Sequence, residues 1–224
     1  MKKQIHIVST PIGNYDDITL RALKILKEAD IVACEEYKQA RRILSHYEIK
    51  KELISLNEHN EEESAREIIS LINEGKKVAQ ISDCGAPLFS DPGHILVDQC
   101  LAAGIEVIPV PGANSLIPAL MGSNLDFEKF YHYGWLSPKK DLRRKELLDL
   151  KKKCELIVLM ETPYRLKAIL ADIKKLFGQH QKIVLAYKLT MPEEKFYRGT
   201  VSDILKIAED KSLKGEFVLL VDNR

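Results

Sequence analysis

Short apolar runs alternate with amphipathic stretches through the first half of the chain. Five runs predict buried strands, at residues 5–8, 31–34, 53–56, 78–82 and 107–110. After the first run, Ile18, Ala22, Ile25 and Ala29 recur at the spacing that places side chains on one face of a helix. Strands that alternate with helices in this way indicate a mostly parallel sheet covered by helices.

The rhythm changes near residues 118–126, where 121–124 has the composition of a linker. Beyond it, a basic helix and a helix that starts at Pro163 separate shorter strands, which predict a mixed sheet. These strands are predicted at residues 130–133, 156–160, 183–188, 195–198 and 216–221. The pattern is therefore that of an α/β protein with two α/β domains, at residues 1–118 and 119–224.

Polar residues at the predicted helix starts indicate capping interactions. Asn60 precedes an apolar-periodic stretch, with Glu63 three positions later, which is the spacing of a capping box. Thr200 and Asp203 repeat that spacing. Gly75 is expected to end the helix that Asn60 begins.

Composition narrows the class of protein. The net charge of +1 argues against a polybasic binder, although it leaves room for a local basic patch. The four cysteines form no C-x-x-C pair and lie near no regularly spaced histidine, so no metal site is expected and a reduced compartment is favoured. Because every apolar run is too short for a membrane span or a secretory leader, we expect a cytoplasmic protein without a membrane segment.

Three loops rich in glycine and proline follow predicted strands, at residues 9–14, 82–93 and 111–115. Ligands of open α/β sheets bind beyond the carboxyl ends of the strands, where such loops meet. Any one of the loops could be an ordinary turn, but three on one sheet edge favour a ligand site. None contains G-x-G-x-x-G or a Walker A motif, which disfavours a dinucleotide-dependent oxidoreductase and an NTP-binding loop.

These loops and several later segments resemble one methyltransferase family. The chain opens with Thr10-Pro11-Ile12-Gly13-Asn14, and matching segments follow in order along nearly the whole sequence. They are residues 17–23, 58–60, 82–83, 90–93, 111–112, 134–136, 138–140, 161–165, 198–199 and 214–218. The chain is thereby identified as similar to the 16S rRNA (cytidine-2′-O)-methyltransferases of the tetrapyrrole (corrin/porphyrin) methylase superfamily.

The resemblance implies a class III methyltransferase fold that binds S-adenosylmethionine in a cleft between two domains, the first carrying the acceptor side. It also implies a homodimer. Matched by position, the cofactor contacts are Pro11, Asp83, Gly85, Phe89, Ser90, Asn114, Ser115, Met160, Ala186, Lys214 and Gly215.

The physical roles of these matched residues differ. Asp83 at a strand end is suited to accept hydrogen bonds from the ammonium or ribose hydroxyls of the cofactor. Gly85 and Gly215 expose backbone that can bond its carboxylate and adenine. Met160 and Ala186 are suited to flank the adenine, with plain core packing as the alternative.

The acceptor side departs from the family pattern. Relatives carry Glu-Asp-Thr-Arg-His-Thr after the second strand, whereas residues 35–40 here read Glu-Glu-Tyr-Lys-Gln-Ala. A ribose hydroxyl is a weak nucleophile that benefits from a nearby base, so the catalytic candidates are Glu35, Glu36 and Lys38. Asn14 and Asn60 are candidate orienting groups. Alternatively, Glu36 sits at a helix N-terminus and Asn60 acts only as a cap.

A basic stretch is the candidate RNA contact. Residues 137–153 contain eight Lys or Arg against three Asp or Glu. Phosphates of RNA would be held by such a patch in a salt-dependent way, through Lys139, Lys140, Arg143 and Arg144. The alternative is the solvated face of an amphipathic helix whose apolar side is Leu142, Leu147 and Leu150.

Three functions remain open at this point. The first is 2′-O-methylation of a cytidine ribose in the rRNA of the small ribosomal subunit. The second keeps the cofactor and changes the acceptor to a tetrapyrrole or another small molecule. The third, prompted by the altered residues 35–40, is a non-catalytic paralogue that binds cofactor or RNA.

Overall fold

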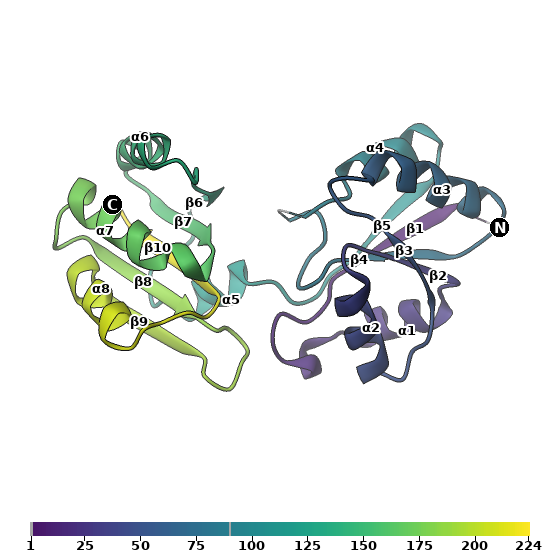
Figure 1. The fold of residues 1–224 in the computed structure, drawn as a ribbon, viewed down its shortest axis with the longest axis horizontal. Coiled ribbons are helices and arrows are strands. Elements are labelled where there is room, and N and C mark those ends of the chain that lie inside the picture. Colours follow the sequence, from purple (N-terminus) through teal and green to yellow (C-terminus); the bar gives the residue numbers. More distant parts are fainter. Residues whose placement is uncertain (1, 90) are drawn as a thin grey trace. The chain divides into compact units, whose positions relative to one another are not determined.

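The chain folds into two compact units in a computed structural model that describes residues 2–89 and 91–224 (Figure 1). Unit 1 runs to Asn114, and unit 2 runs from Ser115 to Arg224. The division falls four residues before the predicted boundary. Each unit contains one five-stranded sheet within the described residues, so two α/β domains are present.

The sheet of unit 1 is parallel throughout. Its strands run in the order β3-β2-β4-β1-β5, with Ile5 of β1 paired to Val78 on one side and Val107 on the other. The parallel sheet predicted from sequence is confirmed. The strands are β1 (Gln4–Val8), β2 (Ile31–Cys34), β3 (Glu52–Ser55), β4 (Val78–Ile81) and β5 (Glu106–Val110).

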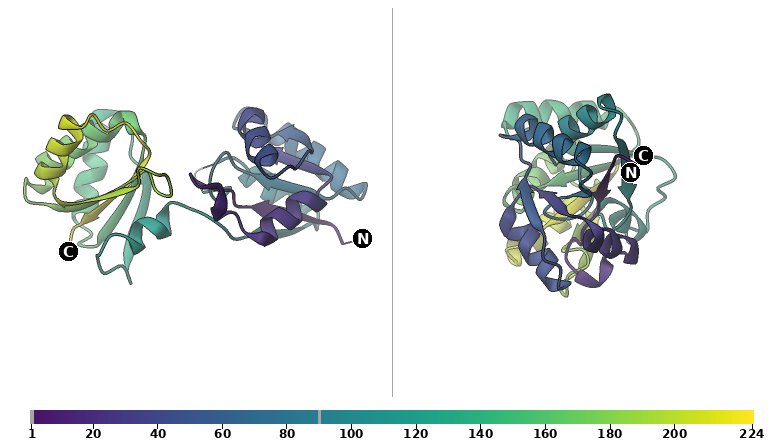
Figure 2. Two further views of the ribbon diagram at one scale, coloured as in Figure 1. Left: turned by 90° about the horizontal axis from the view of Figure 1, so that it is seen from below. Right: turned by 90° about the vertical axis from the view of Figure 1, so that its right-hand side faces the viewer.

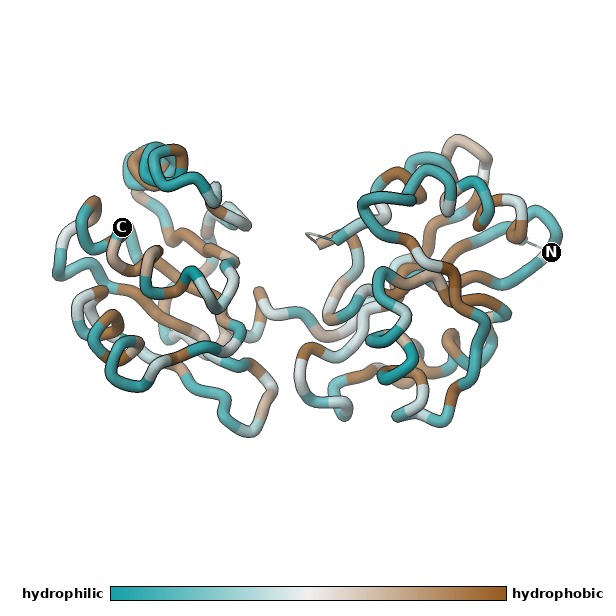
Figure 3. Tube along the Cα trace, in the orientation of Figure 1, coloured by the Kyte–Doolittle hydropathy of each residue, from teal (hydrophilic) through white to brown (hydrophobic). Residues whose placement is uncertain are grey.

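Helices cover both faces of this sheet because its strands are apolar on both sides. Ile7 packs into a core cluster with Ile68 and Leu96, while the next residue, Val8, packs on the opposite side with Leu26. The apolar strands lie inside and the hydrophilic helix surfaces outside in Figure 3. The elements are η1 (Tyr15–Asp17), α1 (Leu20–Glu28), α2 (Tyr37–His46), α3 (Glu61–Asn73) and α4 (His94–Ala102).

One of the two predicted capping boxes forms. The Thr200 hydroxyl accepts from the Asp203 amide, and the Thr200 amide donates to the Asp203 carboxylate, as predicted. Asn60 occupies the N-cap position of α3 but its side chain makes no cap hydrogen bond. Its Oδ1 accepts from the Asn57 amide at 2.8 Å and its Nδ2 donates to the Ser55 carbonyl at 3.2 Å. The capping box predicted for Asn60 and Glu63 is therefore wrong, because the Asn60 side chain braces the preceding loop instead.

The sheet of unit 2 is mixed, as predicted. Its order is β6-β7-β10-β8-β9, in which β6 and β7 are parallel and the other neighbours are antiparallel. The last strand in sequence, β10, thus lies at the centre. The strands are β6 (Phe130–Trp135), β7 (Leu156–Glu161), β8 (Lys182–Tyr187), β9 (Lys195–Thr200) and β10 (Phe217–Asp222).

Three helices cover one face of this second sheet (Figure 2). Leu147, Ile169 and Ile204 of α6, α7 and α8 pack into one core cluster with Leu159 and Leu219 of the strands. A short helix, α5, contacts β10. The elements are α5 (Leu116–Met121), α6 (Lys140–Lys151), η2 (Pro163–Arg165), α7 (Leu166–Phe177) and α8 (Val201–Asp210).

The linker predicted at residues 121–124 is wrong. A Cβ atom on Gly122 would lie 2.1 Å from the Phe196 ring, so the chain packs closely against β9 there. The Arg198 guanidinium donates to the carbonyls of Gly122 and Ser123. These contacts fold the segment into unit 2, after α5.

Candidate cofactor and acceptor site

The strand order of unit 1 brings two of the predicted ligand loops together. The connection from β1 to β2 passes over β4, and the connection from β4 to β5 passes back over β1. This reversal is the point at which open α/β sheets bind ligands. The loops that follow β1 and β4 are joined there by two backbone hydrogen bonds, Thr10 N to Gly85 O at 2.8 Å and Gly85 N to Thr10 O at 3.1 Å.

The third loop closes on the same point. The Ser9 amide donates to Val110 O, and a Cβ on Gly112 would lie 2.9 Å from Ser9 Cβ, so the backbones approach closely. Gly85 has a φ of +78°, and a Cβ on it would lie 3.2 Å from Ile12 Cγ2. A left-handed φ favours glycine, so a larger residue is strained at this junction. All three predicted loops thus meet at the carboxyl edge of the sheet.

Acidic side chains gather at this edge. Asp83, after β4, accepts a hydrogen bond from the Glu36 amide at 3.2 Å, which ties the end of β2 to the loop after β4. Burial, followed by the charges on Asp83 and Asp91, raises the pKa of the neighbouring Glu35 carboxyl. Burial also raises the pKa values of Asp83 and of Asp91. The cluster therefore holds carboxyl groups with increased proton affinity, which is the property a general base at neutral pH needs.

Asp91 was missed by the sequence reasoning, although it lies within one of the predicted loops. A hydrogen bond with Ser82 lowers the pKa of Asp91, and burial outweighs it. Asp91 joins this edge because the loop after β4 folds back toward its own start. The sequence of this twelve-residue loop did not indicate that its end folds back toward its start.

The other acceptor-side candidates have structural partners. Glu36 occupies the N-cap position of α2, as in the alternative interpretation, although its side chain makes no cap hydrogen bond. Asn14 caps η1, because its Oδ1 accepts from the Asp16 amide at 3.0 Å. Lys38 is exposed in the first turn of α2. The acceptor roles of these residues and of Asn60 remain predictions.

The remaining cofactor candidates of unit 1 differ in exposure. Pro11 is buried beside Thr10, and Phe89 is half-buried in the loop after β4. Asn114 is the last residue of unit 1, and Ser115 is the first of unit 2. Ser90 lies outside the described residues.

In unit 2, Met160 and Ala186 lie in one row across the sheet. Val218 of β10 is paired with Met160 of β7 on one side and with Ala186 of β8 on the other. Paired residues project from the same face of a sheet, so the three side chains are neighbours. Trp135 and Phe196 extend the row through β6 and β9. The row is apolar and includes the two residues expected to flank the adenine.

Gly215 lies just before β10 and beside the end of β8. Its amide donates to the Tyr187 hydroxyl at 2.9 Å, and a Cβ on it would lie 2.6 Å from Lys188 Cε. Only glycine fits that space without moving both neighbours. Lys214, the preceding residue, is exposed.

The prediction that Arg143 contacts RNA is wrong. Arg143 is buried, and its Nε and Nη2 donate to Asp172 Oδ2 at 2.9 and 2.8 Å. Arg144 Nε donates to Asp172 Oδ1 at 2.8 Å. A guanidinium that is buried against a carboxylate cannot reach a phosphate, so Arg143 is structural and Arg144 shares its partner. Lys139 and Lys140 are exposed.

The apolar side of the basic helix also differs from its prediction. Leu147 and Leu150 of α6 are buried, whereas Leu142 is 49% exposed. Arg143 takes the place that was predicted for Leu142, because it lies one turn before Leu147 on the same helix face.

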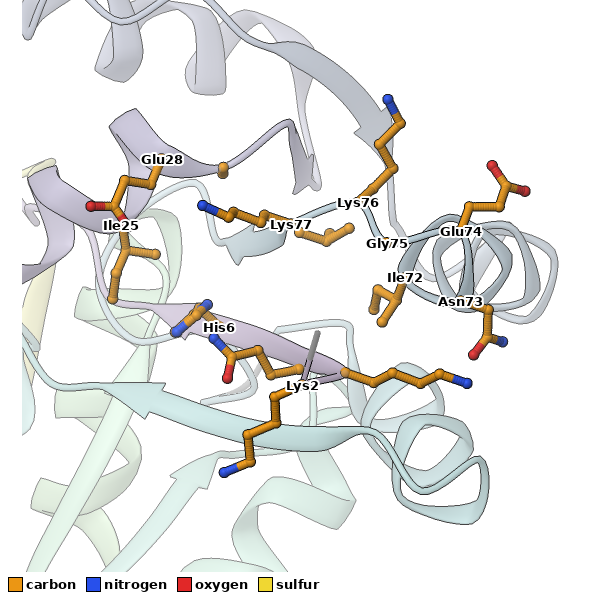
Figure 4. A pocket seen from close by; sticks show the side chains of 14 residues that line it. Lys2, His6, Ile25, Glu28, Ile72, Asn73, Glu74, Gly75, Lys76 and Lys77 are labelled. Carbon is orange, nitrogen blue, oxygen red and sulfur yellow. The ribbon is translucent and has the colours of Figure 1, made fainter.

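A separate pocket lies at the opposite, amino edge of the unit 1 sheet (Figure 4). Its volume is about 660 Å³, and Lys77 and His6 project into it below the last turn of α1. It also lies against the last turn of α3. Carbonyl groups at helix C-termini favour cations, so lysines at this edge have a structural explanation. The three ligand loops are not part of it.

Residues 2–89 and 91–224 contain neither a candidate metal centre nor a candidate membrane span. No group of three or more His, Cys, Asp or Glu side chains there has an arrangement that could hold a metal ion. Among the same residues, no helix combines the length and apolar character needed to cross a membrane.

Comparison with known proteins agrees with this architecture. Residues 4–205 match the family model for tetrapyrrole (corrin/porphyrin) methylases. Among solved structures, a cobalt precorrin-4 methyltransferase superimposes with a TM-score of 0.73 at 20% identity, covering 98% of this chain and 94% of that one. A uroporphyrin-III C-methyltransferase from Thermus thermophilus, in complex with S-adenosylhomocysteine, gives 0.68 at 17% identity, with coverage of 97% and 96%. These two likenesses concern the fold.

Relatives that are more similar in sequence than these solved structures are named as ribosomal RNA methyltransferases. Ribosomal RNA small subunit methyltransferase I of Thermotoga maritima is 41% identical over 218 residues, which cover 97% of each chain. The protein of that name from Halalkalibacterium halodurans is 39% identical over 221 residues, or 99% of this chain and 76% of its own length. The chain therefore belongs to the tetrapyrrole methylase family and, within that family, to the ribosomal RNA small subunit methyltransferase I proteins.

Proposed function

We propose that this protein transfers a methyl group from S-adenosylmethionine to the ribose 2′-oxygen of a cytidine in the rRNA of the small ribosomal subunit. One observation carries the proposal: proteins named ribosomal RNA small subunit methyltransferase I match nearly the whole chain at 39–41% identity. Family membership makes the chain an S-adenosylmethionine-dependent methyltransferase. The nucleotide, its oxygen and the roles of individual residues are the parts that need testing.

The residues present fit the chemistry of this cofactor. Asp83 supplies a half-buried carboxylate for an ammonium or for ribose hydroxyls. Met160 is half-buried and lies in a row with the buried Val218 and Ala186, so its side chain supplies an apolar contact for a flat aromatic base. When bound, the cofactor supplies an activated methyl group on a sulfonium.

Glu35 is the acceptor-side base in this proposal. Its raised pKa gives the carboxylate a higher affinity for a hydroxyl proton than an exposed glutamate has. Asp83 holds the end of β2 through the Glu36 amide, so the loop that carries Glu35 is fixed in place. Alignment of the acceptor oxygen by this fixed loop supplies much of the rate of an in-line displacement.

The test is incubation of purified protein with radiolabelled S-adenosylmethionine and small ribosomal subunits from a strain that lacks the gene. Label on one cytidine ribose is expected. Label on a base or another nucleotide would reject the proposed acceptor. No label, with cofactor binding verified by calorimetry, would favour a small-molecule acceptor or a non-catalytic paralogue.

Two variants separate cofactor binding from chemistry. Asp83→Ala is expected to weaken calorimetric affinity for S-adenosylmethionine, and unchanged affinity would remove Asp83 from the proposed site. Met160→Ala shortens the half-buried side chain of the apolar row and is expected to weaken the same affinity from unit 2. The homodimer and the cytoplasmic location predicted from the sequence remain predictions, for which sedimentation and fractionation are the direct measurements.

A further inference from the structure

Tyr164 is an aromatic side chain held out in solvent. It is 93% exposed, more than the other exposed large hydrophobic side chains, and it lies in η2, directly after β7. Within the part of the chain that the structure describes, its ring stacks on no other ring and its hydroxyl has no hydrogen-bond partner. Single exposed apolar residues are ordinary on protein surfaces, so exposure alone assigns no role to Tyr164.

The position of Tyr164 beside a basic loop changes that interpretation. Strands β6 and β7 are parallel neighbours, with Trp135 paired to Met160, so the loops that follow them leave the sheet at the same edge. The loop after β6 leads to Lys139 and Lys140. Both lysines are exposed, and neither has an ion-pair partner among the described residues.

Arginine side chains fix these two loops against each other. Arg165, next to Tyr164, donates from Nη2 to the carbonyls of Leu136 at 3.0 Å and Ser137 at 2.8 Å. Its Nε lies 3.0 Å from Oε2 of Glu161, whose side chain is fully buried. The residue that anchors the basic loop is therefore the immediate neighbour of the exposed tyrosine.

A second arginine holds the next carbonyl of the basic loop. Arg143 donates from Nη1 to the Pro138 carbonyl at 3.3 Å, while Asp172 holds its other nitrogens. Glu146 accepts from the Ser137 amide at 2.8 Å. Three successive carbonyls, at 136, 137 and 138, are thus bound by guanidinium groups. Exposed lysines that follow such a fixed backbone are presented at a set distance from the tyrosine.

We propose that Tyr164, Lys139 and Lys140 form one contact surface for single-stranded RNA, in which the Tyr164 ring stacks on an unpaired base and the lysines bind flanking phosphates. The proposal rests on the function proposed above. Proteins bind single-stranded nucleic acids through this combination of aromatic rings and cationic side chains. The assignment of Tyr164 is new to that function, and it replaces Arg143 in the RNA contact.

The test compares Tyr164→Leu with Tyr164→Phe. Affinity is measured by fluorescence anisotropy with a short labelled single-stranded RNA over a series of salt concentrations. Tyr164→Leu is expected to weaken binding roughly tenfold, which lies within the range of base–aromatic stacking. Because the substitution removes no charge, the slope of log affinity against log salt should stay unchanged. Tyr164→Phe keeps the ring and should bind as the wild type does.

The lysines are tested with a charge-matched control. Lys139→Gln with Lys140→Gln should reduce the salt slope by about 0.7 for each phosphate that is no longer neutralised. Lys152→Gln with Lys153→Gln removes the same charge at the other end of α6, about 20 Å away at 1.5 Å per residue. This control should leave the slope unchanged. If both double substitutions changed the slope equally, Lys139 and Lys140 would contribute only a general attraction to RNA. That result would overturn their role as specific phosphate contacts.

The outcomes distinguish this surface from the proposed function. Wild-type affinity and wild-type KM for small subunits in Tyr164→Leu would overturn the surface while leaving methyl transfer in place. If Tyr164→Leu lost affinity for the small subunit but not for RNA, Tyr164 would contact a ribosomal protein. That result would also overturn the proposed RNA surface. Failure of the wild type to methylate small subunits, with RNA binding still dependent on Tyr164, would reject the proposed function alone. Unchanged melting and S-adenosylmethionine affinity are required of every variant.

Discussion

Replacing Asp172 by alanine should destabilise unit 2 strongly. The Asp172 side chain is 5% exposed and accepts three hydrogen bonds, two from Arg143 and one from Arg144. The Arg143 side chain is itself only 8% exposed. Without the carboxylate, its guanidinium remains buried with one carbonyl partner, that of Pro138. Removal of one member of a buried ion pair costs about 3–5 kcal/mol of unfolding free energy, and we expect a loss in that range.

Tryptophan fluorescence during urea unfolding is a direct assay. The chain has one tryptophan, Trp135, on β6 in unit 2, so the signal reports the unit that carries the substitution. With a denaturant dependence of about 1–3 kcal/mol per molar, the midpoint should fall by at least about 1 M. Asp149→Ala is the matched control, because Asp149 is exposed on α6 and, among the residues that the structure describes, Lys152 is its one ion-pair partner. Its midpoint should stay near that of the wild type.

The pH dependence of this difference follows from the direction of the Asp172 pKa shift. Burial raises the pKa, but hydrogen bonds from Arg144 and Arg143 outweigh it and lower the pKa below its ordinary value. A carboxyl with a lowered folded-state pKa stabilises the fold above its unfolded pKa of about 3.9 and loses that contribution as the pH falls further. The gap between wild type and Asp172→Ala should therefore narrow in acid. Equal midpoints for Asp172→Ala and Asp149→Ala at neutral pH would refute the reasoning.

Three further outcomes are expected. Glu35→Gln should reduce methyl transfer at least tenfold, because it removes a general base. Its calorimetric affinity for S-adenosylmethionine should change little. Equal losses of activity and of cofactor affinity would make Glu35 a cofactor contact. Because burial and acidic neighbours raise the Glu35 pKa, wild-type activity should begin to fall at a pH above the ordinary glutamate range as the solution is acidified, and Glu35→Gln should lack that limb. Gly85→Ala should lower stability more than Gly75→Ala, since both have positive φ but only the former Cβ meets a neighbour, Ile12, at 3.2 Å; equal melting temperatures would argue against the tight loop junction.

Local patterns were sufficient to predict the alternation of strands and helices. The first sheet was predictable because its strands are apolar on both sides, as at Ile7 and Val8, which favours a parallel sheet between helix layers. The junction between the units was not predictable in this way. Gly122 suggested a break in the chain, and only the contacts of Phe196 and Arg198, more than seventy residues later, fold that segment into unit 2.

The positions of the ligand loops were predictable from the sequence, whereas the positions of the charged side chains were less so. Three loops after strands β1, β4 and β5 had to share an edge once the sheet was parallel, whereas the return of Asp91 depended on the path of a long loop. The burial of Arg143 could have been predicted from its helix position, but the count of basic residues suggested an exposed patch instead. Arg143 shares a helix face with Leu147 and Leu150, and Asp172 lies among the buried residues Ile169, Leu170 and Ile173 of α7. Opposite charges on the apolar faces of two neighbouring helices predict a buried pair.

The central place of β10 has a consequence for how unit 2 is made. This strand follows the other four strands of unit 2 in the sequence, and it pairs with β7 on one side and with β8 on the other. Until residues 217–222 have been added, the two halves of the sheet have no common edge and keep apolar residues such as Val158 and Leu185 without their native neighbours. Pairing between segments distant in sequence is slow to form, and exposed strand edges invite aggregation. Chains truncated before β10 should therefore be recognised as misfolded by chaperones and proteases, so that β10 decides whether unit 2 folds.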